Sequence, residues 1–238
     1  LASSRRVRVE GPLGLERSWN LGASVLHKWK WFRRKWSFAL DLYHSSFTDQ
    51  VVADLDRSPR TLAIYMLDGR SYANSLLADV QVSLNRHLDL KLSYRWYDVR
   101  TTYDGVLRER PFTPTHRGLV DVAYASINDR WRFDITWNLF GAARIPDTDA
   151  NPEAYRLPAR SPAYGTLNAQ FTHVMGALEV YVGGENLTSV QQSRQVLAPE
   201  APFGPFFDAS LIWGPTNQAM IYGGFRHTIN RKPKDPRP

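Results

Sequence analysis

The chain of 238 residues contains no cysteine and only three methionines. Without thiols it forms no disulfide, no thiolate nucleophile and no cysteine-based zinc site. Long apolar runs are missing as well, because no stretch approaches the ~18 to 20 apolar residues of a membrane-spanning helix. Ordered catalytic motifs such as a nucleophile elbow are also absent, so no catalytic residue is expected and an enzyme is the weakest interpretation.

Charge of one sign is in excess but is nowhere concentrated. Lysine and arginine number 30 against 23 aspartates and glutamates, which gives a net charge of +7. The basic residues are spread over the whole chain, so a nucleic-acid partner is not expected. Aromatic residues, by contrast, make up 13% of the chain and include eight tryptophans. Amphipathic rings in such numbers are typical of proteins that contact lipid headgroups.

The clearest secondary-structure signal lies in residues 164–187. Leu167, Ala169 and Phe171 alternate with polar residues, and the same period resumes at Leu178 after a turn around Gly176. A period of two predicts an antiparallel hairpin with one apolar and one polar face. Either a soluble sheet or a membrane barrel supplies the two environments that such strands need.

The alternation recurs and predicts nine strands, with irregular structure at residues 1–17 and in the connection 53–71. The predicted strands cover residues 18–31, 36–52, 72–85, 88–97, 117–124, 131–139, 164–173, 178–187 and 219–229. Turns of a few residues alternate with connections of roughly 15 to 30, and most strands reach about 10 residues. Both regularities favour an all-β fold, a transmembrane antiparallel β-barrel.

Tryptophan positions agree with a barrel. Trp29, Trp31, Trp36 and Trp131 each lie beside a short turn, so in a barrel they would form one girdle at the same rim. In a soluble β-sandwich, which stays open as an alternative, they would be core residues. The basic turn at 33–35 is able to meet lipid phosphates, but a solvated turn beside the girdle is the preferred interpretation.

Several short motifs carry a resemblance to a known family. They are Glu185-Asn186-Leu187-Thr188 followed by the closing strand 219–229, Glu16-Arg17-Ser18-Trp19, and Ser46-Phe47-Thr48-Asp49-Gln50. In order and spacing these motifs resemble the C-terminal barrel half of TonB-dependent outer-membrane receptors. The stretches 69–75, 202–205 and 213–215 are most similar to the Bacteroidetes-type branch.

The resemblance implies that residues 1–230 supply about the last nine strands of a 22-strand barrel, followed by a polar tail at 231–238. The plug, the energy-coupling box and the other strands would then lie elsewhere in a longer precursor, of which this chain is an interior part. Segment 206–213 is assigned to the last outer loop rather than to a strand. Because an open sheet leaves two edges unpaired in lipid, we expect a larger assembly.

Ligand contacts are expected where the resemblance places the outer rim and the outer loops. The candidates are Arg95, Tyr97, Asn138, Arg144, Phe206, Phe207 and Trp213. Other charged residues on the polar strand faces are expected to line a hydrated lumen and to bind the plug. The motif of Glu185, Asn186 and Leu187 is carried over as a feature of the family.

No metal site and no cofactor are expected. Asp147, Asp149 and Asn151 place oxygen ligands at every second position, as at the start of a calcium loop. Pro152 stands where that loop needs glycine, however, and Pro158 where it needs glutamate. No two of the six histidines have the spacing of a metal-binding pair. A solvated acidic loop is therefore the preferred interpretation.

The resemblance implies a receptor in the outer membrane of a Gram-negative cell that imports a scarce nutrient by energy-coupled transport. A siderophore, cobalamin, haem, an oligosaccharide or a peptide would fit equally well. The implied partners are the plug and N-terminal strands of the same receptor, the TonB-ExbB-ExbD motor, outer-membrane lipid and lipopolysaccharide, and a surface lipoprotein. Two other classes stay open: a passive porin-like or structural barrel, and a soluble β-domain that binds a partner.

Overall fold

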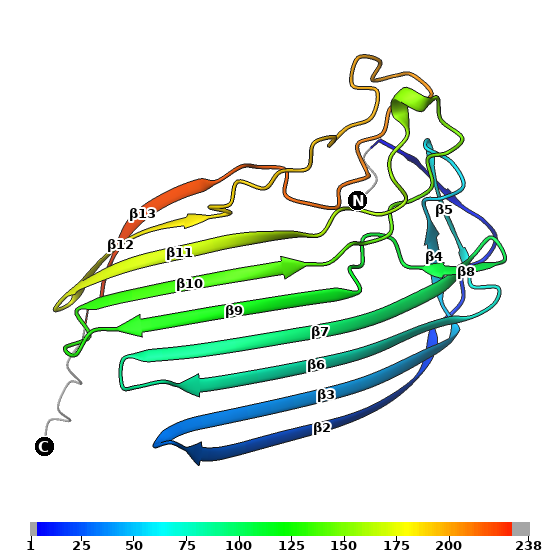
Figure 1. Ribbon diagram of the computed structural model, residues 1–238. Coiled ribbons are helices and arrows are strands. Elements are labelled where there is room, and N and C mark those ends of the chain that lie inside the picture. Colours follow the sequence, from blue (N-terminus) through cyan, green and yellow to red (C-terminus); the bar gives the residue numbers. More distant parts are fainter. Residues whose placement is uncertain (1–3, 230–238) are drawn as a thin grey trace, which may run out of the picture.

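The computed structural model describes residues 4–229, which are almost wholly β-strand and loop (Figure 1). Within that range the only helix is a 3-10 turn, η1 (Glu153–Tyr155), so none of the described helices could cross a membrane. The predicted polar tail at 231–238 lies outside the described residues. The strands are β1 (Arg6–Val9), β2 (Arg17–Trp31), β3 (Arg34–Asp49), β4 (Val51–Asp54), β5 (Thr61–Met66), β6 (Ser71–Ser83), β7 (Leu88–Tyr103), β8 (Val106–Glu109), β9 (His116–Ala125), β10 (Trp131–Phe140), β11 (Tyr164–Met175), β12 (Leu178–Glu185) and β13 (Met220–His227).

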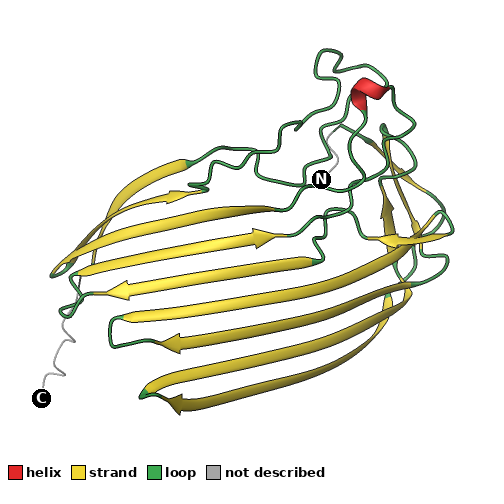
Figure 2. Ribbon diagram, in the orientation of Figure 1, coloured by secondary structure: helices red, strands yellow, loops and turns green. Residues whose placement is uncertain are grey.

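The long strands form one curved antiparallel wall (Figure 2). Their order is β2-β3-β6-β7-β9-β10-β11-β12-β13, and the short strand β8 pairs with the far end of β7. Each long strand therefore pairs with the next long strand along the chain, as in an up-and-down barrel. The nine strands predicted from the alternation correspond one to one to these nine.

A second, three-stranded sheet stands beyond one end of the wall. Its order is β1-β5-β4, with β1 parallel to β5 and β4 antiparallel to it. The prediction that residues 1–17 and 53–71 are irregular is therefore wrong where β1, β4 and β5 form. Arg6 pairs with Thr61, a residue far along the chain, so no local turn signal announces this pairing.

Apolar and polar side chains occupy opposite faces of the wall. Leu90, Val122 and Ile135 lie in register across β7, β9 and β10 on the apolar face. The substantial contacts between elements of the described chain join sheet neighbours, apart from β4 against β7, so no second layer of described residues covers the wall. Leu21 is 75% exposed and Ile221 is 68% exposed, which requires an apolar medium on this face.

The polar face is linked from strand to strand by side-chain hydrogen bonds. Thr136 Oγ1 donates to Asp121 Oδ1 at 2.7 Å, and Arg132 Nη1 lies 3.4 Å from Glu179 Oε1. Further pairs of the same kind are Ser24 with Asp41 and Ser93 with Asp79. Such a face is stable against water or polar protein, so the two sides of the wall require different surroundings.

Short turns and long connections separate to opposite ends of the wall (Figure 1). We call the end with turns 32–33, 84–87, 126–130 and 176–177 the short-turn rim, and the other end the loop rim. The first turn consists of Phe32 and Arg33, both with positive φ (48° and 61°), while Arg34 already begins β3. The turn thus starts one residue earlier than predicted.

Aromatic rings gather at the short-turn rim. The centroids of Trp29 and Trp36 are 6.0 Å apart, and Trp131 stacks on His173 at 3.7 Å. Because both groups adjoin short turns, they lie at the same end of the wall, as a girdle requires.

The packed core of the chain lies at the loop rim rather than in the wall. Among the buried apolar residues, Val82 lies within the wall itself. The others belong to loops, strand ends or the small sheet: Val52, Ala63, Val99, Tyr103, Ala143, Ile145, Leu197, Ala198 and Leu211. We call the small sheet, together with the connections 141–163 and 186–219, the loop cap. Segment 206–213 belongs to the loop cap and contains no strand, as expected.

The last three strands interlock through glycines and tyrosines. A Cβ atom at Gly183 would lie 2.5 Å from the Tyr222 hydroxyl, and one at Gly224 would lie 2.6 Å from the Tyr181 hydroxyl. Each glycine therefore leaves the space that a ring from the neighbouring strand occupies. Tyr222 also donates a hydrogen bond of 3.1 Å to Gln170 on β11, so its ring reaches across β12.

The wall is open at β2 and β13, each of which has one long neighbour among the described strands. Their outer edges present unpaired backbone N–H and C=O groups, which cost several kcal/mol each in lipid. Such a wall is complete in a membrane only when further strands pair with both edges.

The two faces lead to a test at neighbouring positions. Val122→Arg on the apolar face should destabilise the folded protein by about 2 to 4 kcal/mol near the bilayer midplane. Asp121→Asn on the polar face should be nearly neutral, because the amide oxygen still accepts the Thr136 hydrogen bond. Urea unfolding of the full-length protein in liposomes measures both, and equal tolerance would show that the faces are wrongly assigned.

Candidate functional site

One row of side chains crosses the polar face at the loop rim. The row draws one residue from each of five neighbouring strands, β6, β7, β9, β10 and β11. The pairs in register are Leu77 with Arg95, Arg95 with Arg117, Arg117 with Phe140, and Phe140 with Tyr164. Phe140 ends β10 and Tyr164 begins β11, so the row borders the long connections.

Two arginines stand directly opposite one another in this row. Neither Arg95 nor Arg117 forms an ion pair with any residue between 4 and 229, although like charges in register repel. The Arg95 guanidinium lies 4.7 Å from the Tyr97 ring centroid, and that of Arg117 lies 5.1 Å from Phe140. The Nε of Arg95 is buried and donates to no described residue. The pair therefore retains both charge and donors for an anion.

Aromatic rings continue the row into the last long connection. Phe140 stacks on Tyr164 with centroids 4.8 Å apart and planes 17° apart, and Tyr164 meets Trp213 at 6.0 Å. The Tyr164 hydroxyl also donates to the Trp213 carbonyl at 3.4 Å. We call Arg95, Arg117, Phe140, Tyr164 and Trp213 the rim ladder.

A hollow of about 180 Å³ opens beside the rim ladder on the wall. Its lining includes Arg95, Arg117 and Phe140 together with Asn138 and Leu119. Guanidinium groups bind carboxylate or phosphate oxygens in bidentate fashion, and aromatic rings stack on planar ligands. The arrangement is therefore suited to an anionic ligand with a planar part.

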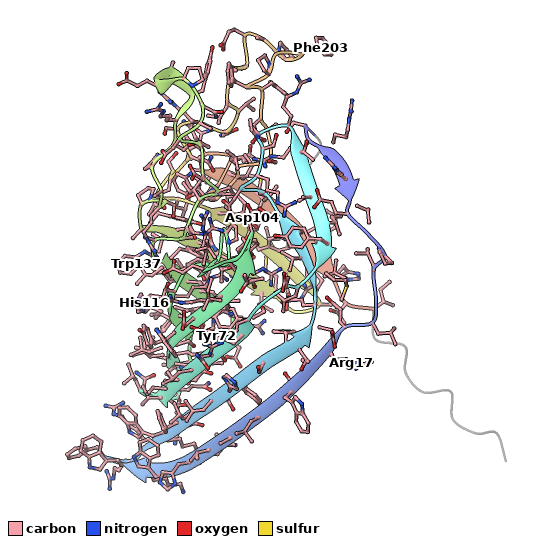
Figure 3. All side chains as sticks on the ribbon, turned by 90° about the vertical axis from the view of Figure 1, so that its right-hand side faces the viewer. Arg17, Tyr72, Asp104, His116, Trp137 and Phe203 are labelled. Carbon is pink, nitrogen blue, oxygen red and sulfur yellow. The ribbon has the colours of Figure 1, made fainter. Side chains whose placement is uncertain are left out.

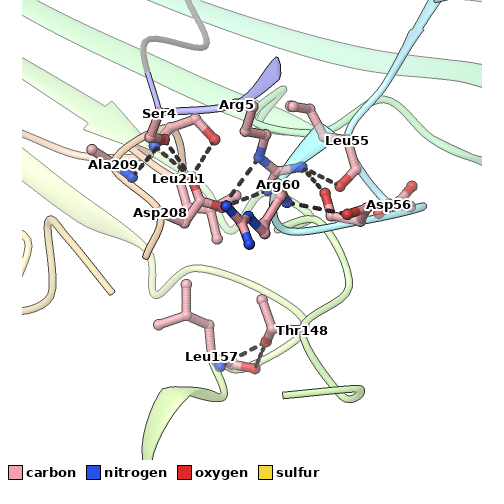
Figure 4. A network of polar contacts seen from close by, with 12 residues as sticks. Ser4, Arg5, Leu55, Asp56, Arg60, Thr148, Leu157, Asp208, Ala209 and Leu211 are labelled. Atoms are coloured by element: carbon pink, nitrogen blue, oxygen red, sulfur yellow. Dashed lines mark hydrogen bonds and ion pairs between the residues drawn. The ribbon is translucent and has the colours of Figure 1, made fainter. Parts of the chain in front are cut away.

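The loop cap above the rim ladder is fixed by a buried ion pair between distant parts of the chain (Figure 4). Arg5 Nη2 lies 2.6 Å from Asp208 Oδ2, and the two side chains are 1% and 0% exposed. Arg5 Nη1 donates to the carbonyls of Leu55 at 2.6 Å and Ser58 at 2.8 Å. Ser4 Oγ donates to the other carboxylate oxygen at 3.1 Å. The Asp208 carboxylate is thus fully paired and joins the last connection to the small sheet.

A second ion pair holds the connection 141–163 to the small sheet. Arg144 donates to both carboxylate oxygens of Asp56, at 2.9 and 3.0 Å, and to the Glu109 carbonyl at 2.6 Å. Nearby, the Tyr65 hydroxyl donates to Asp54 at 2.8 Å. Burial, followed by this hydrogen bond, raises the pKa of Tyr65 to about 12. The loop cap therefore has a polar interior in which each named charge has a partner.

Asn186 organises the start of the last connection. Its φ is 49°, a left-handed conformation that asparagine tolerates well. Its side-chain amide donates to the carbonyls of Val190 at 2.8 Å and Asn217 at 3.0 Å, while its backbone N–H donates to Asn168 at 2.9 Å. The motif residue thereby joins both ends of the last connection to β11. Leu187 adds a backbone bond to the Leu167 carbonyl.

The predicted loop aromatics have different surroundings. Phe206 stacks on Tyr155 at 5.8 Å, and the Tyr155 hydroxyl is bonded to Glu200. Phe207, beside it, is half-buried. Phe203 in the same segment is 97% exposed and lies at the tip of the loop cap in Figure 3, whereas His116 and Trp137 lie together on one side of the wall.

The structure brings some of the predicted site residues together and separates others. Arg95, Tyr97 and Asn138 lie at the row, and Trp213 ends the rim ladder. Arg144 lies in the loop cap in its ion pair, and Phe206 and Phe207 lie with the segment around η1. The residues that sequence reasoning missed are Arg117, Phe140 and Tyr164. Each borders a long connection at a strand end, but only the register between strands shows that they are neighbours.

Within residues 4–229 no three histidine, aspartate or glutamate side chains cluster as a metal site would require. In the loop that resembles the start of a calcium site, Asp147 Oδ1 accepts the Asp149 N–H at 2.8 Å. The Asp147 N–H itself donates to Asp56. These contacts make the acidic segment part of the loop cap.

The buried pair leads to a stability prediction. Asp208→Ala leaves the Arg5 charge buried without its partner, so the loop cap should lose about 3 to 5 kcal/mol. Hydrogen exchange of the full-length protein should show faster exchange in β1, β5 and the connection 186–219. Arg17→Ala removes an exposed pair with Asp49 at 3.7 Å and should leave exchange there unchanged. Unaltered protection in Asp208→Ala would show that the pair does not hold the cap.

Comparison with known proteins agrees with this architecture. The family model described as TonB dependent receptor-like, beta-barrel, matches residues 7–187. No curated protein matches the chain. The identities to solved structures are too low to show more than a shared fold.

Three solved structures illustrate the likeness, and the chain spans about a third of the length of each. A variant of the ferric enterobactin receptor PfeA from Pseudomonas aeruginosa is 11% identical with a TM-score of 0.64, covering 93% of this chain and 32% of that one. The FrpB iron transporter from Neisseria meningitidis is 11% identical with a TM-score of 0.57, covering 94% and 33%. The copper transporter OprC is 12% identical with a TM-score of 0.57, covering 89% and 31%.

The predicted fold and family resemblance are confirmed, while the Bacteroidetes-type branch stays a prediction. Barrels of this family reside in the outer membrane of Gram-negative bacteria. Since the family model matches most of the chain, and the nine-strand wall has the alternation and the separated rims of a membrane barrel, the chain belongs to the TonB-dependent receptor-like β-barrel family.

Proposed function

We propose that this chain is part of an outer-membrane transporter that imports an anionic nutrient by energy-coupled transport. The observation that carries the proposal is the opposition of Arg95 and Arg117 on the polar face, at the loop rim and without carboxylate partners in the described chain. Two neighbouring guanidinium groups that face a lumen attract and orient an anion. Their position beneath the loop cap suits a vestibule.

The rim ladder gives the ligand a second requirement. Phe140, Tyr164 and Trp213 form a series of rings beside the charged pair, and such rings bind planar or aromatic groups. We therefore assign ligand contact to Arg95, Tyr97, Asn138 and Trp213 of the residues predicted from sequence. Arg144 acts as a positioning residue for the cap, and Phe206 and Phe207 border the entrance.

Transport requires parts of the receptor beyond this wall. The unpaired edges at β2 and β13 support further barrel strands, and the polar face supports a plug that fills the lumen. We propose that the TonB-ExbB-ExbD motor acts on this plug from the periplasm, where the short-turn rim would lie. The loop rim would then face outward, toward lipopolysaccharide and, in some receptors, a surface lipoprotein.

Energy coupling is tested by uptake into cells that carry the full-length protein. Radiolabelled ferric citrate and ferric enterobactin serve as anionic probes, and each is measured with the motor intact and deleted. We expect uptake of at least one probe, and we expect it to cease without the motor. Equal uptake in both strains would instead identify a passive, porin-like barrel.

The arginine pair is tested by substitution. Arg95→Gln combined with Arg117→Gln should weaken binding of the transported anion by about 100-fold or more, since two charged hydrogen bonds of about 1.5 to 3 kcal/mol each are lost. Binding to purified full-length protein is measured by isothermal titration. Arg132→Gln is the matched control, because that arginine faces the same lumen but is paired with Glu179 near the short-turn rim. A similar loss in control and double variant would refute a specific role for the pair.

A further inference from the structure

A concentration of positive charge remains at the short-turn rim, far from the rim ladder. Two neighbouring turns, 32–33 and 84–87, border a notch of about 540 Å³. Its lining carries the four cations Arg33, Arg34, Lys35 and Arg86 and a single acid, Asp89. We call these four cations the turn patch. The sequence predicts a solvated turn at residues 33–35. The structure adds a third arginine, Arg86, from a different hairpin and a concave surface between the two turns.

The charge of the turn patch is not neutralised by the protein. None of its four side chains forms an ion pair or a side-chain hydrogen bond with a residue in the described range 4–229, whereas many other arginines do. Lys35 also stands in register opposite Lys30 on β2. Like charges directly opposite one another destabilise a sheet, and a bound anion would remove that cost.

Aromatic rings adjoin the turn patch. Trp31 lies 4.6 Å from Phe32 and 6.0 Å from Trp36, and Trp36 is 6.0 Å from Trp29. Trp31 is 56% exposed and Phe32 is 76% exposed. Rings of this kind are stable at the boundary between headgroups and acyl chains. The turn patch therefore sits at the level where lipid phosphates lie.

The other two short turns lack this combination. Turn 126–130 contains one cation, Arg130, and one acid, Asp129, and turn 176–177 consists of glycine and alanine. The excess of cations over acids at the short turns is thus found at the part of the rim formed by β2, β3, β6 and β7. An aromatic girdle alone would not require the cations to gather at one part of the rim.

We propose that the notch binds the headgroup of an anionic phospholipid, with the turn patch on its phosphate and the neighbouring rings on its glycerol and acyl region. Arginine binds phosphate in bidentate fashion, and Phe32, whose ring contacts Trp31, lines the notch beside these cations. The inference rests on the membrane placement in the proposed function. It assigns the lipid to the leaflet at the short-turn rim, opposite the leaflet that meets the loop cap.

The test is native mass spectrometry of the full-length protein, purified in detergent and supplied with phosphatidylglycerol or phosphatidylcholine. We expect retained phosphatidylglycerol and little phosphatidylcholine. In the triple variant Arg33→Gln, Arg34→Gln, Arg86→Gln the phosphatidylglycerol-bound fraction should fall about tenfold or more, because cations near an anionic lipid each add to the attraction. Arg130→Gln, in a different short turn, should retain the lipid.

Three results would overturn the inference. Equal retention of both lipids, or unchanged retention in the triple variant, would show that the turn patch does not select anionic lipid. Displacement of phosphatidylglycerol by millimolar inorganic phosphate would show a general phosphate site, and persistence of the lipid supports a headgroup site. Uptake of the anionic probes is a separate readout. If uptake is the same with and without the motor, the proposed transport is refuted, but the lipid site still stands or falls by the retention measurement.

Discussion

Backbone hydrogen bonding between neighbouring strands is the constraint on which this structure depends. In lipid every N–H and C=O must find a partner within the protein, so strands cross a bilayer only as neighbours in a continuous sheet. The pairing fixes the period of two, and the period of two fixes which side chains meet hydrocarbon and which meet the lumen. Leu90 and Val122 share one face for this reason, and Arg95 and Arg117 share the other.

The same constraint explains why the chain has its packed core outside the wall. A single sheet between two solvents has no second layer to pack against, so strand residues such as Leu21 stay exposed within the chain. At the loop rim the connections are long enough to fold on one another, and there Leu211 and Asp208 become fully buried. Most of the buried side chains of the described chain are therefore at the loop rim, whereas the turns at the opposite end are too short to fold on one another.

Much of this fold can be predicted from the sequence because alternation is a local signal. The nine strands, their faces and the separation of turns from long connections follow from residues two apart. The register between β7 and β9 cannot be predicted in this way, since the connection 104–115 is too long to set it. Arg95 was therefore found as a candidate alone, and its neighbour Arg117 was not. The ion pair of Arg144, a candidate ligand contact in the sequence, cannot be predicted in this way either, because its partner Asp56 lies in a different connection.

The tie between Arg5 and Asp208 has a consequence for how the molecule forms. These residues are 203 positions apart, so the contact closes a loop that includes nearly the whole wall. The entropy of closing so long a loop is lost before the ion pair compensates for it, which makes such contacts late events in folding. Strand hairpins can form successively from local turns, but the loop cap can assume its final shape only after the eight long strands between these two residues are in place. A partly inserted barrel would therefore have an incompletely folded loop cap.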